Sequence, residues 1–144
     1  MILLLTDFGR PYTAQMLAAI HRIAPNEKAL VLFDDLPSFN PKAAGHLIEA
    51  YCSDFPEDSI FCCVVDPGVG SPRSPLVVRA KDRWFLGPDN GLFACLLSAD
   101  ETAQAWIIDW RPEVLSPSFH GRDLFAPFAA KLAREGEGIL GNAA

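Results

Sequence analysis

One short segment of the sequence combines the residue types that acid–base chemistry needs. Segment 66–73 begins with Asp66, ends with Arg73 and holds two glycines and two prolines between them. Because glycine and proline direct the backbone along few paths, we expect the carboxylate and the guanidinium to meet across the loop. A guanidinium beside a carboxylate favours the ionised acid. The pair predicts either a polar site that handles protons or an ion pair that only closes the loop.

A second segment, 118–123, reads Ser-Phe-His-Gly-Arg-Asp. His120 precedes a glycine at the start of a predicted helix. Since imidazole changes its charge near neutral pH, His120 is a candidate general acid or base. A histidine in this place can equally cap the helix or fill the core. Arg122 and Asp123 have a similar alternative as ordinary residues of a first helical turn.

Acidic turns recur where predicted strands end. Asp7, Asp66 and the pair Asp89 and Asn90 each follow an apolar run that reads as a strand. In an open α/β sheet, ligands bind beyond the carboxyl ends of the strands, so these turns predict one shared polar site. An aspartate at a strand end also commonly caps a turn or a helix, and that alternative stays open for each of them.

The spacing of apolar residues predicts the elements that position these side chains. Strands are expected over 2–6, 29–33, 59–65, 76–79, 83–86 and 105–109, and helices over 12–23, 42–52, 92–98 and from 119–123 to about 134. The alternation predicts one α/β domain, residues 1–135, with a largely parallel central sheet flanked by helices. The Gly/Ala-rich tail, 136–144, is expected to be frayed.

Composition restricts the partners and the compartment. The net charge of −6 disfavours a nucleic-acid partner, which would select a basic surface. The apolar runs are too short to cross a bilayer, so no membrane partner is expected. The N-terminus lacks the features of a signal peptide, which predicts a cytoplasmic protein. The four cysteines form no C-x-x-C pair and are predicted to be reduced, mostly buried thiols.

Taken together, four motifs resemble one enzyme family, the SAM hydroxide adenosyltransferases. These enzymes hydrolyse S-adenosyl-L-methionine (SAM) to adenosine and methionine, and they are related to enzymes that attack the same carbon of SAM with fluoride or chloride. The matching segments occur in the family's order and are Leu5-Thr6-Asp7-Phe8-Gly9, Val64 to Ser71 with Arg73, Gly87-Pro88-Asp89-Asn90-Gly91, and Phe119-His120-Gly121-Arg122-Asp123 followed by Phe125-Ala126-Pro127.

The resemblance implies roles for individual residues. Asp66, Arg73 and His120 match the set that holds and activates a water or hydroxide, and Asp7 matches the carboxylate that grips the ribose hydroxyls. Neither a metal nor a cofactor is implied, since SAM is the substrate. The other substrate-binding positions implied by the resemblance are Phe8, Phe39, Phe119, Asp89 and Asn90, the last two with a role that lies open between pocket and scaffold.

The resemblance also implies partners. Family members form homotrimers in which the active site lies between the N-terminal domain of one subunit and a smaller β-rich, adenine-binding C-terminal domain of its neighbour. That second domain is not expected in this chain. The chain is then either a fragment, or it works with a separate chain that supplies the domain, or it no longer turns over SAM. The sequence further departs from the family after Gly9, where an expected aspartate is lacking, and at Asp34 or Asp35, one of which stands where a histidine is common.

Two other functions remain open at this point. The chain could be a non-catalytic module that binds nucleosides or forms oligomers while retaining the fold. It could also be a metal-dependent hydrolase that uses Asp7, Asp66, Asp89 and His120, because carboxylates and one histidine can hold a metal ion.

Overall fold

The strands form one central sheet. The computed structural model describes residues 1–66 and 73–141, and its strands form a six-stranded sheet of order β2-β1-β3-β5-β4-β6. β1, β2, β3 and β5 run parallel, whereas β4 is antiparallel to both β5 and β6. The strands are β1 (Ile2–Thr6), β2 (Ala29–Phe33), β3 (Ile60–Val64), β4 (Pro75–Ala80), β5 (Arg83–Pro88) and β6 (Gln104–Ile107).

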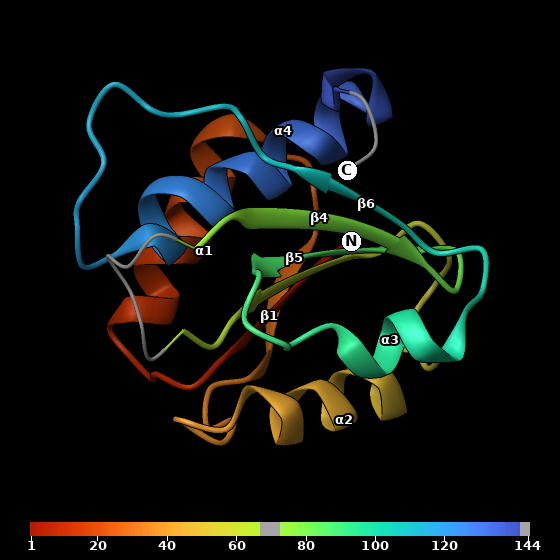
Figure 1. The fold of residues 1–144 in the computed structure, drawn as a ribbon. Helices are drawn as coiled ribbons and strands as arrows, with labels where there is room; N and C mark the ends of the chain where they lie inside the picture. Colours follow the sequence, from red (N-terminus) through yellow and green to blue (C-terminus); the bar gives the residue numbers. More distant parts are fainter. Residues whose placement is uncertain (67–72, 142–144) are drawn as a thin grey trace.

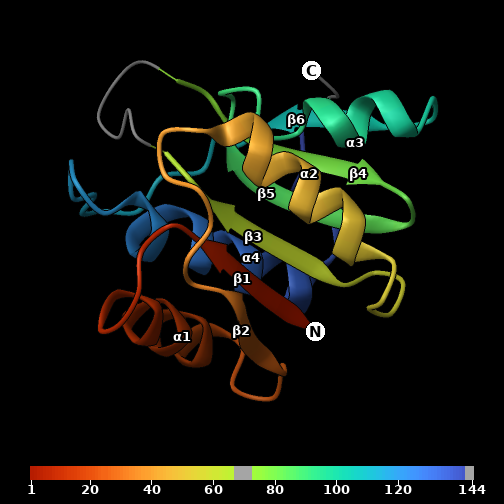
Figure 2. The same cartoon turned by 90° about the horizontal axis from the view of Figure 1, so that it is seen from below.

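Helices cover both faces of the sheet. The helices α1 (Tyr12–Ile23) and α4 (Ala126–Glu135) lie on one face, and α2 (Pro41–Cys52) and α3 (Ala94–Ala99) lie on the other (Figure 1). The same two layers are seen from below in Figure 2. This arrangement explains why β1 and β3 are buried at every position, since both faces of a parallel sheet are covered.

The side chains of the central strands divide between two cores. In β1, Leu4 packs toward α1 and α4, whereas Leu3 and Leu5 pack toward α2 and α3. In β3, Cys62 and Cys63 point to opposite cores in the same way. This alternation follows from the period of two in a strand. Burial raises the pKa of the Cys62 thiol to about 12, so this thiol stays protonated.

Local signals explain where several elements begin and end. Asn40 caps α2, because its side-chain oxygen accepts a hydrogen bond from the Ala43 N–H at 3.1 Å. Gly136 ends α4 with a φ of 79°, a conformation that glycine adopts without strain. β4 and β5 form a hairpin whose loop residues, Lys81 and Asp82, both have positive φ, as a two-residue turn of the I′ type requires.

The predicted α/β class with its largely parallel sheet is confirmed, and the boundaries differ at the C-terminal end. The last helix does not start as a plain α-helix, because a π-helical turn (η1, Gly121–Phe125) precedes α4. A 3₁₀ turn (η2, Glu137–Ile139) follows, and Ile139 and Leu140 pack against the core. The described part of the expected frayed tail is therefore partly packed, because its two apolar side chains have a surface to cover. Residues 142–144 lie outside the described residues.

Two further features bear on the sequence-based expectations. No helix in the described ranges is long and apolar enough to cross a membrane. All four cysteines are free thiols, and three of them, Cys52, Cys62 and Cys63, are buried.

Candidate active site

The parallel strands bring the three acidic turns to one edge of the sheet. β1, β3 and β5 are neighbours and run in the same direction, so their carboxyl ends lie side by side. Asp7 follows β1 and Asp66 comes two residues after β3. Their carboxylates are near enough that the charge of Asp66 raises the pKa of Asp7. The sheet thus gathers residues that are about sixty positions apart in the sequence.

Asp66, Arg73 and His120 line the same small cavity. Arg73 Nη1 donates a hydrogen bond to Asp66 Oδ1 at 3.0 Å, and the Asp66 side chain is only 9% exposed. The cavity has a volume of about 60 Å³, which is large enough for a water molecule. His120 reaches it from the start of η1, and Arg111 lines it from the segment after β6. Segment 67–72, in which the family resemblance is densest, lies outside the described residues.

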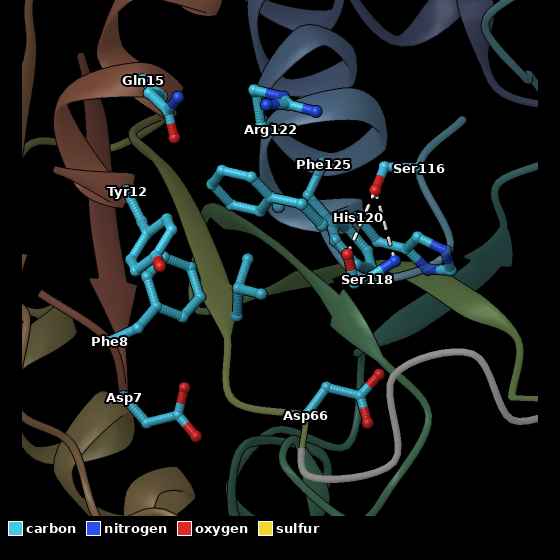
Figure 3. Close-up of a pocket in the computed structure, with 13 residues that line it drawn as sticks. Asp7, Phe8, Tyr12, Gln15, Asp66, Ser116, Ser118, His120, Arg122 and Phe125 are labelled. Carbon is cyan, nitrogen blue, oxygen red and sulfur yellow. Dashed lines mark hydrogen bonds between the residues drawn. The ribbon is translucent and has the colours of Figure 1, made fainter. Parts of the chain in front are cut away.

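A larger pocket of about 530 Å³ opens beside this cavity and shares three of its residues, Asp66, His120 and Phe125. Its volume falls in the range of small-molecule sites. Asp7 and Asp66 lie at one end of the pocket in the view of Figure 3, and Gln15 and Arg122 lie at the other. The pocket therefore has carboxylates at one end, a cation at the other and apolar surface between them.

Three aromatic rings form one wall of the pocket. Phe8, Tyr12 and Phe119 meet edge to face, with ring centroids 5.6 to 6.1 Å apart. This T-shaped arrangement is favourable, because the positive edge of one ring faces the negative face of another. Phe8 follows β1, Tyr12 begins α1 and Phe119 precedes η1, so the wall joins three separate segments. An apolar ring or a thioether could lie against it.

Asp7 carries an electrostatic cost in the folded protein. Burial raises the pKa of the Asp7 carboxyl above its ordinary value of 3.8, and the nearby Asp66 charge raises it further. A hydrogen bond to its own backbone N–H and another from the Ser38 side chain lower the pKa and offset part of this rise. A ligand that donates hydrogen bonds to the Asp7 carboxylate would therefore stabilise its ionised form and offset this cost.

Removing this charge should make the protein more stable. Because the pKa of Asp7 is raised in the folded state, ionisation favours unfolding, and stability falls as pH rises from 3.8 through the folded pKa. We expect Asp7→Asn to raise the melting temperature at pH 7. The gain in free energy of unfolding should be no more than about 1 kcal/mol, because the site is partly solvated. The gain should vanish below pH 3.8. Thermal unfolding of both proteins as a function of pH measures it, and a variant that is less stable at pH 7 would contradict the assignment.

Asp89 and Asn90 form a brace, a set of hydrogen bonds that fixes the backbone on either side of segment 66–73. The Asn90 Nδ2 donates to the Val65 carbonyl at 2.8 Å, and Asn90 Oδ1 accepts from the Leu92 N–H at 3.2 Å. The Asp89 N–H donates to the Ser74 carbonyl at 2.9 Å. The turn therefore holds the chain immediately before Asp66 and immediately after Arg73. Neither side chain lines the two cavities, so this geometry favours scaffold over pocket, the two roles left open by the sequence.

Some pocket residues differ from those that the resemblance implied. Phe39 is 82% exposed and lines neither cavity in this chain, so its expected place in the pocket wall stays a prediction. The pocket is also lined by polar residues that sequence reasoning did not propose: Gln15, Ser116, Ser118 and Arg122. Gln15 lies three residues after Tyr12, so helical periodicity alone could have placed both on the same face of α1. The serines precede η1 in a segment without regular structure and offer no such signal.

Comparison with known proteins decides the family. The sequence profile of the SAM hydroxide adenosyltransferase N-terminal domain matches residues 2–139. The chain belongs to this family.

Relatives are similar to this chain along most of its length. A protein of Thermus thermophilus named (R)-S-adenosyl-L-methionine hydrolase is 37% identical over 142 residues, which cover 90% of this chain and 55% of that protein. A protein of the same name from Methanocaldococcus jannaschii is 33% identical over 140 residues, which cover 91% of this chain and 52% of that protein. The chain thus spans about half the length of these curated relatives.

The fold of this chain is shared as well. The crystal structure of an uncharacterized conserved protein from Thermotoga maritima matches with a TM-score of 0.93 and 34% sequence identity, and the match covers 100% of this chain and 58% of that chain. In the described residues of this chain, no group of three or more His, Cys, Asp and Glu side chains is placed to hold a metal ion. Asp89, one of the four candidate ligands, lines neither cavity.

Proposed function

We propose that this domain carries the nucleophile-activating half of an enzyme that hydrolyses SAM to adenosine and L-methionine. The observation that supports it most directly is the small cavity lined by Asp66, Arg73 and His120 at the mouth of a pocket large enough for a nucleoside. The relatives named as SAM hydrolases match over nine-tenths of this chain, which supports the same reaction.

The proposed reaction is an in-line displacement at the ribose C5′ carbon. An oxygen from water or hydroxide bonds to C5′ while the C5′–sulfur bond breaks and its electrons go to sulfur. Because the sulfonium becomes a neutral thioether, methionine leaves without protonation. The protein has to align and desolvate the nucleophile. Asp66 or His120 accepts its proton, and Arg73 holds Asp66 and favours the anionic oxygen.

The larger pocket supplies the substrate contacts in this proposal. A carboxylate can accept hydrogen bonds from both hydroxyls of a cis-diol, and Asp7, whose pKa is raised by burial, would recover stability by doing so. The ring wall of Phe8, Tyr12 and Phe119 offers apolar surface to the ribose or to the thioether. In Figure 3, Asp7 lies at the same end of the pocket as Asp66.

We further propose that a neighbouring subunit or a separate chain completes the substrate site, within a homotrimer. The pocket is lined by residues of α1, η1, the segment before η1 and the ends of β1 and β3, and the matched relatives are about twice as long as the region they share with this chain. The cytoplasm is the compartment that we propose, because free thiols persist in a reducing environment.

Incubation with SAM tests the function. The chain is mixed with SAM, alone and together with an added C-terminal domain of the matched relatives, and adenosine and methionine are quantified by chromatography against a protein-free reaction. Equimolar products support the proposal. Adenosine binding by calorimetry without products would favour the alternative of a nucleoside-binding module. Absence of both products and binding in both mixtures would overturn the proposal.

A further inference from the structure

The segment that carries His120 has no regular secondary structure to hold it. Residues 108–120 connect β6 to η1, and the end of this connector supplies Ser116, Ser118, Phe119 and His120 to the pocket. Such a segment needs side-chain contacts to fix its position, because it lacks the repeated backbone hydrogen bonds of a helix or strand.

Asp123 holds this segment at two points, one through its carboxylate and one through its backbone N–H. Its Oδ2 accepts a hydrogen bond from the Ser116 N–H at 2.8 Å, and its Oδ1 accepts one from Arg122 Nε at 2.7 Å. The Asp123 N–H donates to the Phe119 carbonyl at 3.2 Å. Asp123 thus bonds to residues on both sides of His120 in the chain, with Ser116 and Phe119 before it and Arg122 after it.

Arg122 extends the same arrangement to the aromatic wall. Its guanidinium carbon lies 4.9 Å from the centre of the Phe119 ring, within the range of a cation–π contact. The hydrogen bonds to Asp123 keep the guanidinium in that place, with Nε at 2.7 Å and Nη2 at 3.3 Å from the two carboxylate oxygens. Bidentate pairing of this kind fixes orientation as well as distance.

The electrostatics agree with this geometry. The hydrogen bond from Arg122 is the main reason that the pKa of Asp123 is lowered, with a smaller contribution from the Ser116 N–H. The Asp123 side chain is 15% exposed and lines neither cavity. It therefore remains a carboxylate at neutral pH and acts on the pocket only through its neighbours.

We propose that Asp123 is a positioning residue of the active site, which holds His120 and Phe119 in place through Ser116 and Arg122. This proposal rests on the proposed function, because His120 matters only if it handles the proton of the nucleophile. The connector then needs no secondary structure of its own, because the ionised Asp123 side chain fixes the C-terminal end of the connector and, through Arg122, the Phe119 ring. The charged groups that face His120 are Asp66, Arg73 and Arg111 across the small cavity, and Asp123 from its own element.

Asp123→Asn tests the proposal, because it keeps the shape but removes the charge. We expect hydrogen exchange of the Ser116 amide to become at least about tenfold faster, and the ring-proton NMR signals of His120 to move, while amides of β3 keep their exchange rates. With SAM as substrate, kcat should fall about 10- to 100-fold while KM changes less, because Asp7 and Phe8 are untouched. Asp123→Glu, which retains the charge, should recover part of the loss.

Asp109→Asn is the matched control, since it removes an exposed carboxylate from the same connector. Unchanged His120 signals in a folded Asp123→Asn protein would overturn the positioning role, and so would altered signals with an unchanged kcat. If Asp123→Asn does not fold, Arg122→Met gives the second measurement: it should shift the Phe119 ring signals and speed the exchange of the Ser116 amide. The NMR measurements need no turnover. A wild-type chain that forms no product even with the added C-terminal domain therefore counts against the proposed function and leaves the test of Asp123 intact.

Discussion

Replacing Asp66 with Asn should reduce adenosine formation from SAM by about a thousandfold or more without unfolding the protein. The substitution preserves size but removes the carboxylate that pairs with Arg73 at 3.0 Å and lines the small cavity with His120. An amide can neither take the proton of the nucleophile nor hold the guanidinium by charge, and loss of a positioned general base typically costs about 10²–10⁴ in rate. Product formation under saturating SAM, in the assembly in which the wild type is active, measures the effect.

Asp54→Asn is the control for this experiment, because it makes the same chemical change on an exposed residue after α2. Its activity should equal that of the wild type. The melting curve of Asp54→Asn should lie close to the wild-type curve. Asp66→Asn should melt at a lower temperature and still be folded, because Asp66 is only 9% exposed and Arg73 loses its charged partner. An Asp66→Asn protein that stays folded and turns over SAM at the wild-type rate would remove Asp66 from the mechanism.

Gly87→Ala should lower the stability of the domain by about 3 kcal/mol or more. Gly87 lies in β5, next to β3, and a Cβ added there would lie 2.4 Å from the Cys63 carbonyl oxygen and 2.9 Å from the Phe93 ring. The first of these neighbours is backbone of the adjacent strand, so it cannot turn away as a side chain can. Overpacking a buried position in this way displaces the backbone, which is among the costliest effects of a point substitution.

Chemical denaturation and thermal unfolding measure this loss, with an expected fall in melting temperature of about 10 °C. Gly138→Ala is the control, since a Cβ at that position meets nothing within 4 Å. It should be neutral. Because β5 leads directly into the turn of Asp89 and Asn90, the Gly87→Ala variant should also disturb the brace at the Val65 carbonyl. Equal stabilities of the two glycine variants would show that β3 and β5 tolerate a wider spacing than the structure indicates.

The fold class could be predicted because its signals are local. Apolar runs without alternation indicated strands buried on both faces, and the division of Leu3 and Leu4 between two cores bears this out. The convergence of Asp7 and Asp66 followed from parallel strands alone. The strand order was not predictable, because nothing in the sequence of β6 states that it pairs with β4. The partner of an edge strand depends on how the other strands of the sheet are arranged.

The pocket was predictable only where a motif marked it. Phe119 was expected among the substrate-binding positions; it lines the pocket in contact with Phe8, and its substrate role stays a prediction. For Arg122 the sequence left open an ordinary role in a first helical turn, and nothing in it indicated that this residue lines the pocket. A helical pattern distinguishes buried from exposed faces, but it does not say which polar end of a helix overlooks a cavity formed by other segments.

The brace formed by Asp89 and Asn90 separates two tasks, which are to hold the backbone of the site and to supply its reactive side chains. Its bonds anchor the chain at Val65 and at Ser74, one residue outside either end of segment 66–73. Both bonds lie outside segment 66–73, so substitutions at Asp66 or Arg73 leave them in place. The reactive side chains of the small cavity could therefore be exchanged while the hydrogen bonds of this turn still anchor the backbone that carries them.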